Sequence, residues 1–538
     1  MDNSSEKSIC YLLQDVIKFK EYMETRERVT RSAGIVGLGI SFSRITGFLR
    51  DILIAARFGA GAITDAFFVA FMIPNLLRDL LAEGALSVAF IPVFTEYLTV
   101  KGKREAWILA SRIINLLIIV TSMIVLIGIV LAPFVLSSLP LDMIKGGDPI
   151  LAARLLQVMF PFIIFISLAA LSMGILNSLG RFGLPSFSSV MLNVAMILSL
   201  LLLWSKPSIE GIIGLAIAVL IGGAAQFLIQ VPGLVQEKID YLPTVDIKDE
   251  GVKRIGLLMI PRAIGSAAYQ INILICRTLA WTISPGWVTS LYYADRLVQL
   301  PGALFGVSLT TALFPTLSRQ AAAKEMDDLK KSINSGLRLL LFLAIPSSIG
   351  LMTLGRHIIA VLFQRHAFAE MATRNTYLAL WFYSLGIFSY GGTRLVSSCF
   401  YALQDTKTPV MTSILSMGIN ILFSLLLMKG LEGGGLTLAA SISASFNLAL
   451  LLGILRERIG GFGGKGILTT FFKVLLASVV MAAVSYGVVS FLGSGVKGLL
   501  LGIIAGVTVF FTVSKVLKIE EAAFLLKLIK RPKFFEGK

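Results

Sequence analysis

The clearest pattern along this chain is a series of long apolar stretches separated by short polar segments, recurring from residue 33 to residue 520. Most of these stretches reach the roughly 20 residues that a helix needs to cross a bilayer. We therefore predict an all-α polytopic membrane protein with about fourteen transmembrane helices. The predicted spans are 33–58, 63–98, 105–138, 149–179, 184–204, 209–235, 255–281, 286–318, 332–353, 375–403, 408–428, 434–455, 466–493 and 498–514.

Composition agrees with this interpretation. Of 538 residues, 56% are hydrophobic and only 15% are charged, whereas soluble domains carry about 25% charged residues. A soluble enzyme, a nucleic-acid-binding protein and a secreted disulfide scaffold are therefore excluded as descriptions of the whole chain. The three cysteines form no spaced framework, and His357 and His366 share one polar stretch between spans. We expect neither a metal site nor histidine-based catalysis in the membrane.

The net charge of +17 has an ordinary explanation in the positive-inside rule. With the N-terminus in the cytoplasm, inner segments hold 29 Lys and Arg residues and outer loops hold 7. This bias predicts that both termini are cytoplasmic and that the number of spans is even. The outer loop 356–374, with three arginines, is the exception, and we interpret part of it as an interfacial segment. Residues 1–32 fit either an interfacial amphipathic helix or a region upstream of an alternative start at Met23.

Two landmarks recur at nearly the same offset and indicate a duplication. "AFIPVF" places Pro92 at the end of the second span, and "ALFPTL" places Pro315 223 residues later. "LGRFGLP" and "LQDTKTP" place Pro185 and Pro409 224 residues apart. Each copy contains six spans, and an even number preserves orientation. The two copies should therefore be parallel, with a pseudo-twofold axis along the membrane normal, which is a usual frame for alternating access.

The repeat suggests a division into five parts. They are an N-terminal cytoplasmic extension (1–32), an N-lobe (33–240), a C-lobe (241–460), an additional helix pair (461–520) and a basic cytoplasmic tail (521–538).

Charged residues inside the spans are the chemical anomaly of this sequence. Twelve are basic: Arg44, Arg50, Arg57, Arg78, Arg112, Arg154, Arg262, Arg277, Arg296, Arg338, Arg394 and Lys473. The acidic ones are Asp51, Asp65, Asp79, Glu83 and Asp295. An arginine at the bilayer centre costs at least about 2.5–3.5 kcal/mol. This surplus of positive charge therefore requires water, acidic partners or an anionic ligand.

Depth separates these residues. Arg44 lies about 17 Å into the first span and Arg78 about 22 Å into the second, and Arg296 lies about 10 residues into the eighth. These three cannot easily reach an interface, whereas Arg50 is intermediate. Internal salt bridges are one interpretation, and an electropositive cavity between two lobes is the other. Arginine suits a cavity for phosphate or pyrophosphate because its planar guanidinium binds such groups in a bidentate manner.

Other basic residues fit simpler explanations. Those near span ends can extend their side chains to the membrane surface, and they are Arg57, Arg112 and Arg338. For four further intramembrane positions, structural pairing is the expectation, and they are Arg154, Arg277, Arg394 and Lys473.

Four stretches closely resemble one family. They are "SFSRITGFLRDILIAARFG" (41–59), "TDAFFVAFMIPNLLRDLLAEGALSVAFIPVF" (64–94), "LYYADRLVQLPGALFGVSL" (291–309) and "YALQDTKTP" (401–409). They resemble the MurJ/MviN family of lipid II flippases, in the multidrug/oligosaccharidyl-lipid/polysaccharide exporter superfamily. The resemblance covers about residues 33–520. It implies two six-helix lobes plus two C-terminal helices, and transport of undecaprenyl-pyrophosphate-linked peptidoglycan precursor to the outer leaflet.

The resemblance also implies roles for particular residues. The cavity arginines of the family fall on Arg44, Arg50, Arg78 and Arg296, and its gating cluster falls on Arg50, Asp51 and Arg78. Further candidates near these motifs are Ser43, Asp65, Glu83 and Asp295. The last two spans resemble a pair that forms a groove for the lipid tail. Their glycines at 498, 502 and 506 form one smooth face, which suits either a packed helix or an acyl chain.

We expect a transporter rather than an enzyme, located in the bacterial inner membrane and serving cell-wall synthesis and cell shape. Its partners would be lipid II, membrane lipids and, as an open alternative, other cell-wall proteins, but no nucleic acid. No G-x-x-x-x-G-K-[ST] motif is present, so a coupled cation (sodium or proton) or the membrane potential is the expected energy source. The alternatives are an exporter of drugs or of another polyprenyl-linked glycan, an intramembrane enzyme, and a scaffold.

Overall fold

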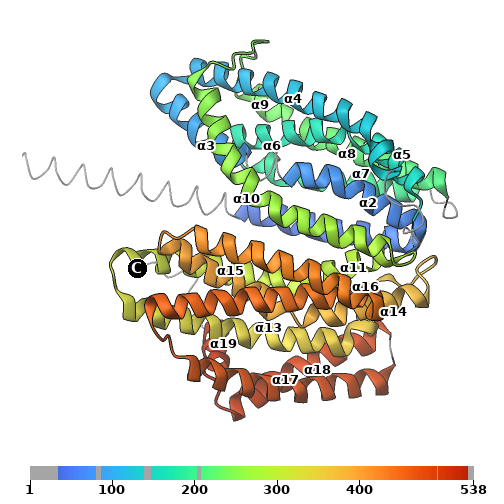
Figure 1. Cartoon of the computed structure of the whole chain (residues 1–538), viewed down its shortest axis with the longest axis vertical. Coiled ribbons are helices and arrows are strands. Elements are labelled where there is room, and N and C mark those ends of the chain that lie inside the picture. The colour runs from blue at the N-terminus through green and yellow to red at the C-terminus, as the bar shows by residue number, and fades with distance from the viewer. Residues whose placement is uncertain (1–33, 80–85, 138–146, 203–207, 494, 531–538) are drawn as a thin grey trace, which may run out of the picture.

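The computed structural model describes residues 34–79, 86–137, 147–202, 208–493 and 495–530 (Figure 1). Every element in these ranges is a helix, which confirms the predicted all-α membrane protein. Figure 1 shows two stacked helical bundles, the first half of the chain in one and most of the second half in the other. The predictions for residues 1–32 and for Glu83 lie outside the described residues. We call the end at which the first helix begins the inner end, following the predicted orientation.

The N-terminal bundle begins with a helix through residues 34–58. It continues with α2 (Ala62–Leu77), α3 (Ser87–Glu96), η2 (Tyr97–Lys101), α4 (Lys103–Ser137), α5 (Pro149–Met159), α6 (Phe162–Ser178), α7 (Gly183–Leu202), α8 (Ile209–Leu228) and α9 (Val231–Gln236). Helices α5 and α6 meet at an angle of 40° and together cover one predicted span. Pro161 lies at this bend, where a proline interrupts the helical hydrogen bonds.

Helix α10 (Glu250–Trp281) follows and lies along the edge of the first bundle in Figure 1. The second bundle contains α11 (Trp287–Pro301), η4 (Gly302–Val307), α12 (Ser308–Ala322), α13 (Met326–Phe363), α14 (Glu370–Ser384), α15 (Ile387–Ala402) and α16 (Lys407–Ile459). Helix α16 holds two predicted spans, 408–428 and 434–455. They are separated by a break at Glu432, whose φ is 50°. A loop between these spans is therefore reduced to a sharp kink.

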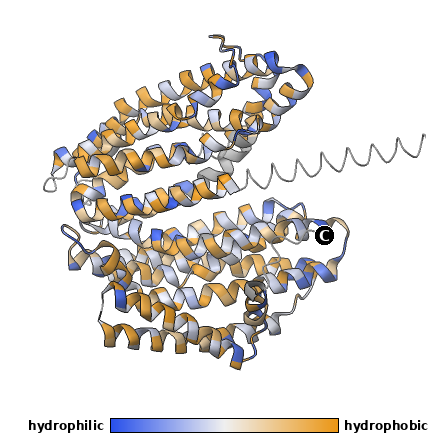
Figure 2. Cartoon of the chain, turned by 180° about the vertical axis from the view of Figure 1, so that it is seen from behind, coloured by the Kyte–Doolittle hydropathy of each residue, from blue (hydrophilic) through white to orange (hydrophobic). Residues whose placement is uncertain are grey.

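Each predicted span falls on a helix or a run of helices among the described residues. Within the described ranges, and judged by length and apolar composition alone, eight helices can cross a membrane, or nine if the bent pair counts as one span. The count of fourteen is consistent with this arrangement and stays a prediction, as do the boundaries of the five predicted parts. Figure 2 shows apolar residues along most of the helix surfaces and polar residues mainly at the helix ends.

The predicted interfacial segment at 356–374 stays a prediction. Helix α13 continues to Phe363 and α14 begins at Glu370, which leaves residues 364–369 as the only connection. Arg356 forms an ion pair with Glu370 at 2.6 Å, so one arginine of this segment is neutralised by its neighbour. A helix of 38 residues is long enough to project beyond the bilayer, so we expect these charges to lie in the polar region.

The two turns that indicated a duplication have the same backbone geometry. In the first, the N–H of Arg181 bonds the carbonyl of Leu176 at 2.8 Å, and the preceding residue has a φ of 75°. In the second, the N–H of Asp405 bonds the carbonyl of Phe400 at 2.9 Å, and the preceding residue has a φ of 62°. Both are Schellman caps, in which a left-handed residue closes the end of a helix. This shared geometry supports the interpretation of a repeat.

The same two turns carry ion pairs of opposite polarity. Arg181 contacts Glu237 at 2.9 Å, and its hydrogen bond lowers the pKa of the Glu237 carboxyl. At the equivalent place, the acidic Asp405 pairs with Arg458. Hydrogen bonds from Thr408 lower the pKa of Asp405 to about 2. In the first copy, the charge in the turn thus contacts the residue that follows the short helix α9, and in the second copy it contacts the last turn of α16.

The additional helices α17 (Gly464–Leu492), α18 (Val496–Val516) and α19 (Glu520–Lys530) lie on the far side of the second bundle (Figure 1). Phe342 and Ile345 of α13 share a buried cluster with Val474 and Ala477 of α17. Arg338, which we expected to reach the membrane surface, instead contacts Glu521 of α19 at 2.6 Å. The helix pair is therefore attached to α13 by both apolar packing and charge.

The glycine face of α18 packs against α17 and is not open to an acyl chain. A Cβ atom at Gly502 would lie 2.6 Å from Val489, and one at Gly506 would lie 2.0 Å from Ser485. Such contacts are possible only for glycine, because no side chain fits between the two helices. The interpretation of this face as a packing surface is confirmed. A lipid-tail groove elsewhere on the pair stays a prediction.

Candidate functional site

The centre of the contact between the two bundles holds a group of four bonded side chains. Arg50 and Asp51 come from the first helix, and Tyr292 and Arg296 come from α11. We call these four residues the central cluster. The sequence brings each pair together on its own helix. Arg50 and Asp51 are adjacent, and Tyr292 and Arg296 lie one turn apart on the same face of α11.

Arg50 is almost completely buried and fully engaged. Its Nη2 donates to Asp51 Oδ1 at 2.7 Å, and its Nη1 donates to Asn193 Oδ1 at 2.9 Å. The same Nη2 also donates to the Tyr292 hydroxyl at 3.1 Å. Because a buried guanidinium requires a counter-charge and hydrogen-bond acceptors, these partners explain how Arg50 is tolerated in the membrane interior.

Asp51 is shared with a second arginine from the other bundle. Arg296 Nε lies 3.2 Å from Asp51 Oδ2, and the Arg296 Nη2 donates to the Tyr292 hydroxyl at 3.0 Å. The Tyr292 hydroxyl in turn donates to Asp51 Oδ1 at 3.2 Å. Two guanidinium groups thus surround one carboxylate, so the central cluster keeps a surplus positive charge. Arg296 is 39% exposed and Asp51 only 2%, so a ligand can reach Arg296.

Aromatic packing fixes the tyrosine in this position. The ring of Phe68 from α2 stacks on the ring of Tyr292 with centroids 4.1 Å apart. The guanidinium groups of Arg296 and Arg277 lie 5.2 and 5.6 Å from the Tyr292 ring centroid. Arg277, which we expected to serve structure alone, therefore lies beside the central cluster. These contacts leave the Tyr292 hydroxyl as the polar end of a rigid side chain.

Asn193 of α7 supports the first helix next to the central cluster. Its Nδ2 donates to the carbonyl of Ser43 and to the hydroxyl of Thr46, both at 3.1 Å, while its Oδ1 accepts from Arg50. The hydroxyl of Ser43 accepts a bond from Ser189 at 2.9 Å. Ser43 thus helps to hold the first helix on α7, which fits a positioning role better than direct ligand contact.

Asp65 lies at the outer end of the contact between the bundles, where its carboxylate acts as a helix cap. Its carboxylate accepts bonds from the backbone N–H of Gly286 at 2.7 Å and of Thr289 at 2.8 Å. The Thr289 hydroxyl adds a third bond at 2.5 Å. A carboxylate of the first bundle therefore caps the N-terminus of α11 in the second, where the helix dipole favours negative charge. All of these acceptor positions are used within the protein.

A backbone bond closes the same outer end. The N–H of Ala367 donates to the carbonyl of Ala56 at 3.0 Å, which ties the 364–369 connection to the first helix. Gly59 in the next turn has a φ of 67°, and a Cβ there would lie 2.3 Å from the Ala367 carbonyl oxygen. We call Asp65, Gly286, Thr289 and the Ala56–Ala367 bond the outer seal. These contacts join the two bundles at their outer ends.

Arg78 lies in a separate group. Its described acidic partner is Asp79, at 3.1 Å, rather than Asp51. Asp79 also accepts a bond from Gln270 of α10 at 2.9 Å. Residues 78–79 have π-helical geometry, and η4 begins 224 residues later with the same geometry. Such π segments are frequent at functional sites. The implied gating cluster is thus divided, with Arg50 and Asp51 in one group and Arg78 in another.

The other candidates are less engaged. Arg44 is exposed, and in the described part of the chain it makes no ion pair or hydrogen bond. Asp295 is partly buried and accepts a bond from Gln299 at 2.7 Å. Arg57, which we expected to extend outward, is buried and donates to the carbonyl of Leu200 at 2.9 Å. Its position beside the end of α7 satisfies that carbonyl, which explains why it stays inside.

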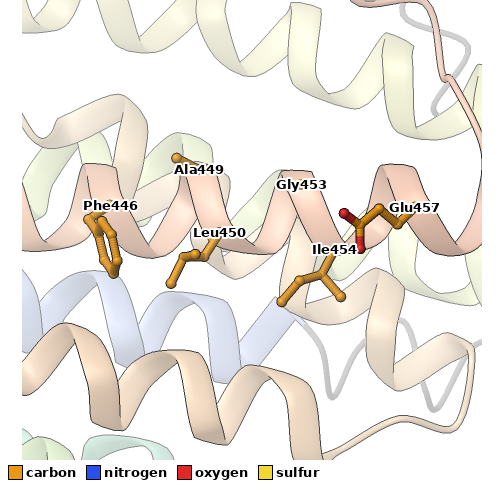
Figure 3. Close-up of a pocket in the computed structure, with 6 residues that line it drawn as sticks. All are labelled: Phe446, Ala449, Leu450, Gly453, Ile454 and Glu457. Carbon is orange, nitrogen blue, oxygen red and sulfur yellow. The ribbon is translucent and has the colours of Figure 1, made fainter.

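A shallow pocket of about 300 Å³ lies elsewhere, on one face of α16 (Figure 3). Its lining residues are Phe446, Ala449, Leu450, Gly453, Ile454 and Glu457. Glu457 is the single charged group in this lining, and no arginine takes part. The pocket therefore does not suit an anion. Among the described residues, no group of three or more His, Cys, Asp or Glu side chains could hold a metal ion.

Comparison with known proteins gives a consistent result. The family model described as "Lipid II flippase MurJ" matches residues 54–506. A "Probable lipid II flippase MurJ" from Vibrio cholerae is 38% identical over 434 residues, which cover 79% of this chain and 82% of that protein. A "Lipid II flippase MurJ" from Burkholderia cenocepacia is 34% identical over 451 residues, covering 82% and 87%.

Solved structures agree with this result. The structure "Lipid II flippase MurJ, inward closed conformation" matches with a TM-score of 0.74 and 29% identity, over 89% of this chain and 98% of that chain. An inward-facing multidrug resistance MATE family transporter matches with a TM-score of 0.66 and 16% identity, over 78% of this chain and 96% of that chain. The second likeness concerns the fold alone.

Proposed function

Because this chain belongs to the lipid II flippase MurJ family, we propose that it moves lipid II from the inner to the outer leaflet of the bacterial inner membrane. Lipid II is the undecaprenyl-pyrophosphate-linked muropeptide from which peptidoglycan is built. The protein is a multi-pass membrane transporter and not an enzyme. It works by alternating access, in which the two bundles expose a site between them first to one side and then to the other.

The surplus positive charge of the central cluster is the observation that carries this proposal. Arg50 and Arg296 share the single carboxylate of Asp51, and Arg296 is partly exposed. A pyrophosphate group supplies the missing negative charge and several acceptor oxygens, which guanidinium groups bind in pairs. Arg44 is exposed and unpaired among the described residues, and it lies on the inner half of the helix that carries Arg50. It supplies a first contact for the pyrophosphate.

The outer seal defines the order of events. With Asp65 capping α11 and Ala367 bound to Ala56, the headgroup enters from the inner side. Transport then requires these bonds to break while the inner ends of the bundles approach each other. The polyprenyl tail remains in the bilayer throughout, because a charged site excludes it. Both a coupled cation, sodium or proton, and the membrane potential alone are compatible with this cycle.

Arg296 provides the direct test. Arg296→Ala removes the accessible guanidinium, and we expect loss of lipid II flipping in cells depleted of other flippases, with normal membrane insertion. Arg296→Lys should recover little activity, because an ammonium group replaces the planar fork. Arg154→Ala is the matched control, since Arg154 lies within a span but has an exposed side chain.

The result that contradicts the proposal is full flipping by Arg296→Ala and by Arg78→Ala. An assay with a different polyprenyl-linked glycan distinguishes transport of lipid II from the alternative function, which is export of that other glycan. Transport of that glycan with no transport of lipid II would replace the proposed substrate while retaining the mechanism.

A further inference from the structure

The Tyr292 hydroxyl occupies an unusual position between the two bundles. It accepts bonds from Arg50 Nη2 at 3.1 Å and from Arg296 Nη2 at 3.0 Å, and it donates to Asp51 at 3.2 Å. Two of these partners belong to the first helix and one belongs to α11. One phenolic oxygen therefore bridges two guanidinium groups that would otherwise repel each other.

The two arginines differ in their access to a ligand. The side chain of Arg50 is 7% exposed, whereas that of Arg296 is 39% exposed. An anion that reaches the central cluster therefore meets Arg296 first. Once Arg296 turns to an anion, it gives up bonds to Tyr292 and Asp51. The closed arrangement then loses one of its links across the bundle contact.

We propose that Tyr292 is a positioning residue that couples anion binding at Arg296 to opening of the outer seal. Without a ligand, its hydroxyl holds Arg296 and Arg50 around Asp51 and keeps the bundles together. With pyrophosphate on Arg296, this set of bonds is incomplete and the seal opens. The inference rests on the proposed function, because it takes the anion to be the headgroup of lipid II.

The neighbouring tyrosine provides a matched control. Tyr293 is fully buried, stacks on Phe363 at 4.7 Å, and its hydroxyl has no hydrogen-bond partner among the described residues. Tyr293→Phe thus removes an unbonded hydroxyl, whereas Tyr292→Phe removes a bonded one. Both changes preserve the ring, so the stacking of Tyr292 on Phe68 is retained.

The test measures opening of the seal directly. A cysteine at Ala55, which is fully buried one turn beyond Asp51 on the same helix face, reports access from outside to a membrane-impermeant maleimide. The native cysteines at 10, 276 and 399 are replaced by alanine in the full-length protein. Labelling is followed in cells that make lipid II and in cells in which its synthesis is blocked.

We expect slow labelling without lipid II in the parent and in Tyr293→Phe, and faster labelling of both when lipid II is present. Without lipid II, Tyr292→Phe should be labelled about tenfold faster than the parent, since hydrogen bonds to charged groups are among the stronger ones. Addition of lipid II should increase the labelling rate of Tyr292→Phe only slightly. Phe68→Leu removes the ring that stacks on Tyr292 but keeps the Tyr292 hydroxyl. Labelling of this variant should therefore still depend on lipid II, which distinguishes the effect of ring packing from that of hydrogen bonding.

Two results overturn the inference. One is labelling of Tyr292→Phe as slow as that of Tyr293→Phe, and the other is labelling of Tyr292→Phe that still rises strongly with lipid II. Failure of the proposed function looks different, because the parent itself would then flip no lipid II and show no response to it.

Discussion

Asp51 and Asp65 are both buried carboxylates in the contact between the bundles, yet they are stabilised differently. Asp51 is neutralised by two guanidinium groups. In the part of the chain that the structure describes, Asp65 is bonded by N–H groups and one hydroxyl at the start of α11. Asp51 therefore belongs to the anion site. Asp65 is a helix cap, and its loss should destabilise the closed state of the outer end.

We expect Asp65→Asn to weaken the outer seal. An amide replaces one acceptor oxygen by a donor that faces an N–H of α11, which costs about 1–3 kcal/mol. The purified protein should melt at a lower temperature, and the cysteine reporter at Ala55 should react faster from outside. Glu210→Gln, at an exposed position in the first turn of α8, is the control. Unchanged melting and labelling of Asp65→Asn would contradict a sealing role.

The residues that bear charge could be found from the sequence, but their partners could not. Depth in an apolar span identifies Arg296 and Arg78 without any structure. The bond between Arg50 and Asn193 joins positions 143 residues apart, and that between Arg50 and Tyr292 joins positions 242 residues apart. Tyr292 had one usable signal, its place one turn before Arg296. Asn193 had none, because an asparagine in a span has many ordinary explanations.

At the scale of the element, apolar length predicts where helices occur but not how they are joined. Pro161 lies at the bend between α5 and α6, and a proline inside an apolar run is a local signal for such a break. The break inside α16 at Glu432 lies in the polar, glycine-containing segment that separates two predicted spans, so its position was indicated by the sequence but its sharpness was not. The glycine face of α18 was ambiguous for a physical reason, since a smooth surface suits a helix and an acyl chain equally well.

We expect Gly506→Leu to disrupt the packing of α18 on α17. A larger side chain must enter the space of Ser485, and overpacking of this kind costs typically about 1–3 kcal/mol. Gly487→Leu is the matched control, because nothing lies within 4 Å of a Cβ at that position on α17. Fluorescence-detected size exclusion after heating should show earlier aggregation for Gly506→Leu alone. Equal stability of the two variants would show that the helices pack differently.

At the scale of the whole molecule, orientation is the main prediction from charge. Cysteines at Gly61 or Gly495, where a side chain meets no neighbour, should react with an impermeant thiol reagent from outside. Cysteines at Lys103 or Gln236 should react only after permeabilisation. Gly147 is unsuitable as an outer reporter, because a Cβ there would collide with the Trp281 indole. The reversed labelling pattern would overturn the orientation and the direction of transport.

The surplus charge of the central cluster also has an electrical consequence. Each elementary charge that crosses a membrane potential of 100 mV does or requires about 2.3 kcal/mol of work. The empty cluster, with Arg50 and Arg296 around Asp51, is positive, so its return to inward access is favoured by a negative cell interior. Pyrophosphate reverses the sign of the occupied cluster, so its passage outward is favoured by the same potential. The resting voltage of the cell would thus drive both halves of the cycle in the direction of export.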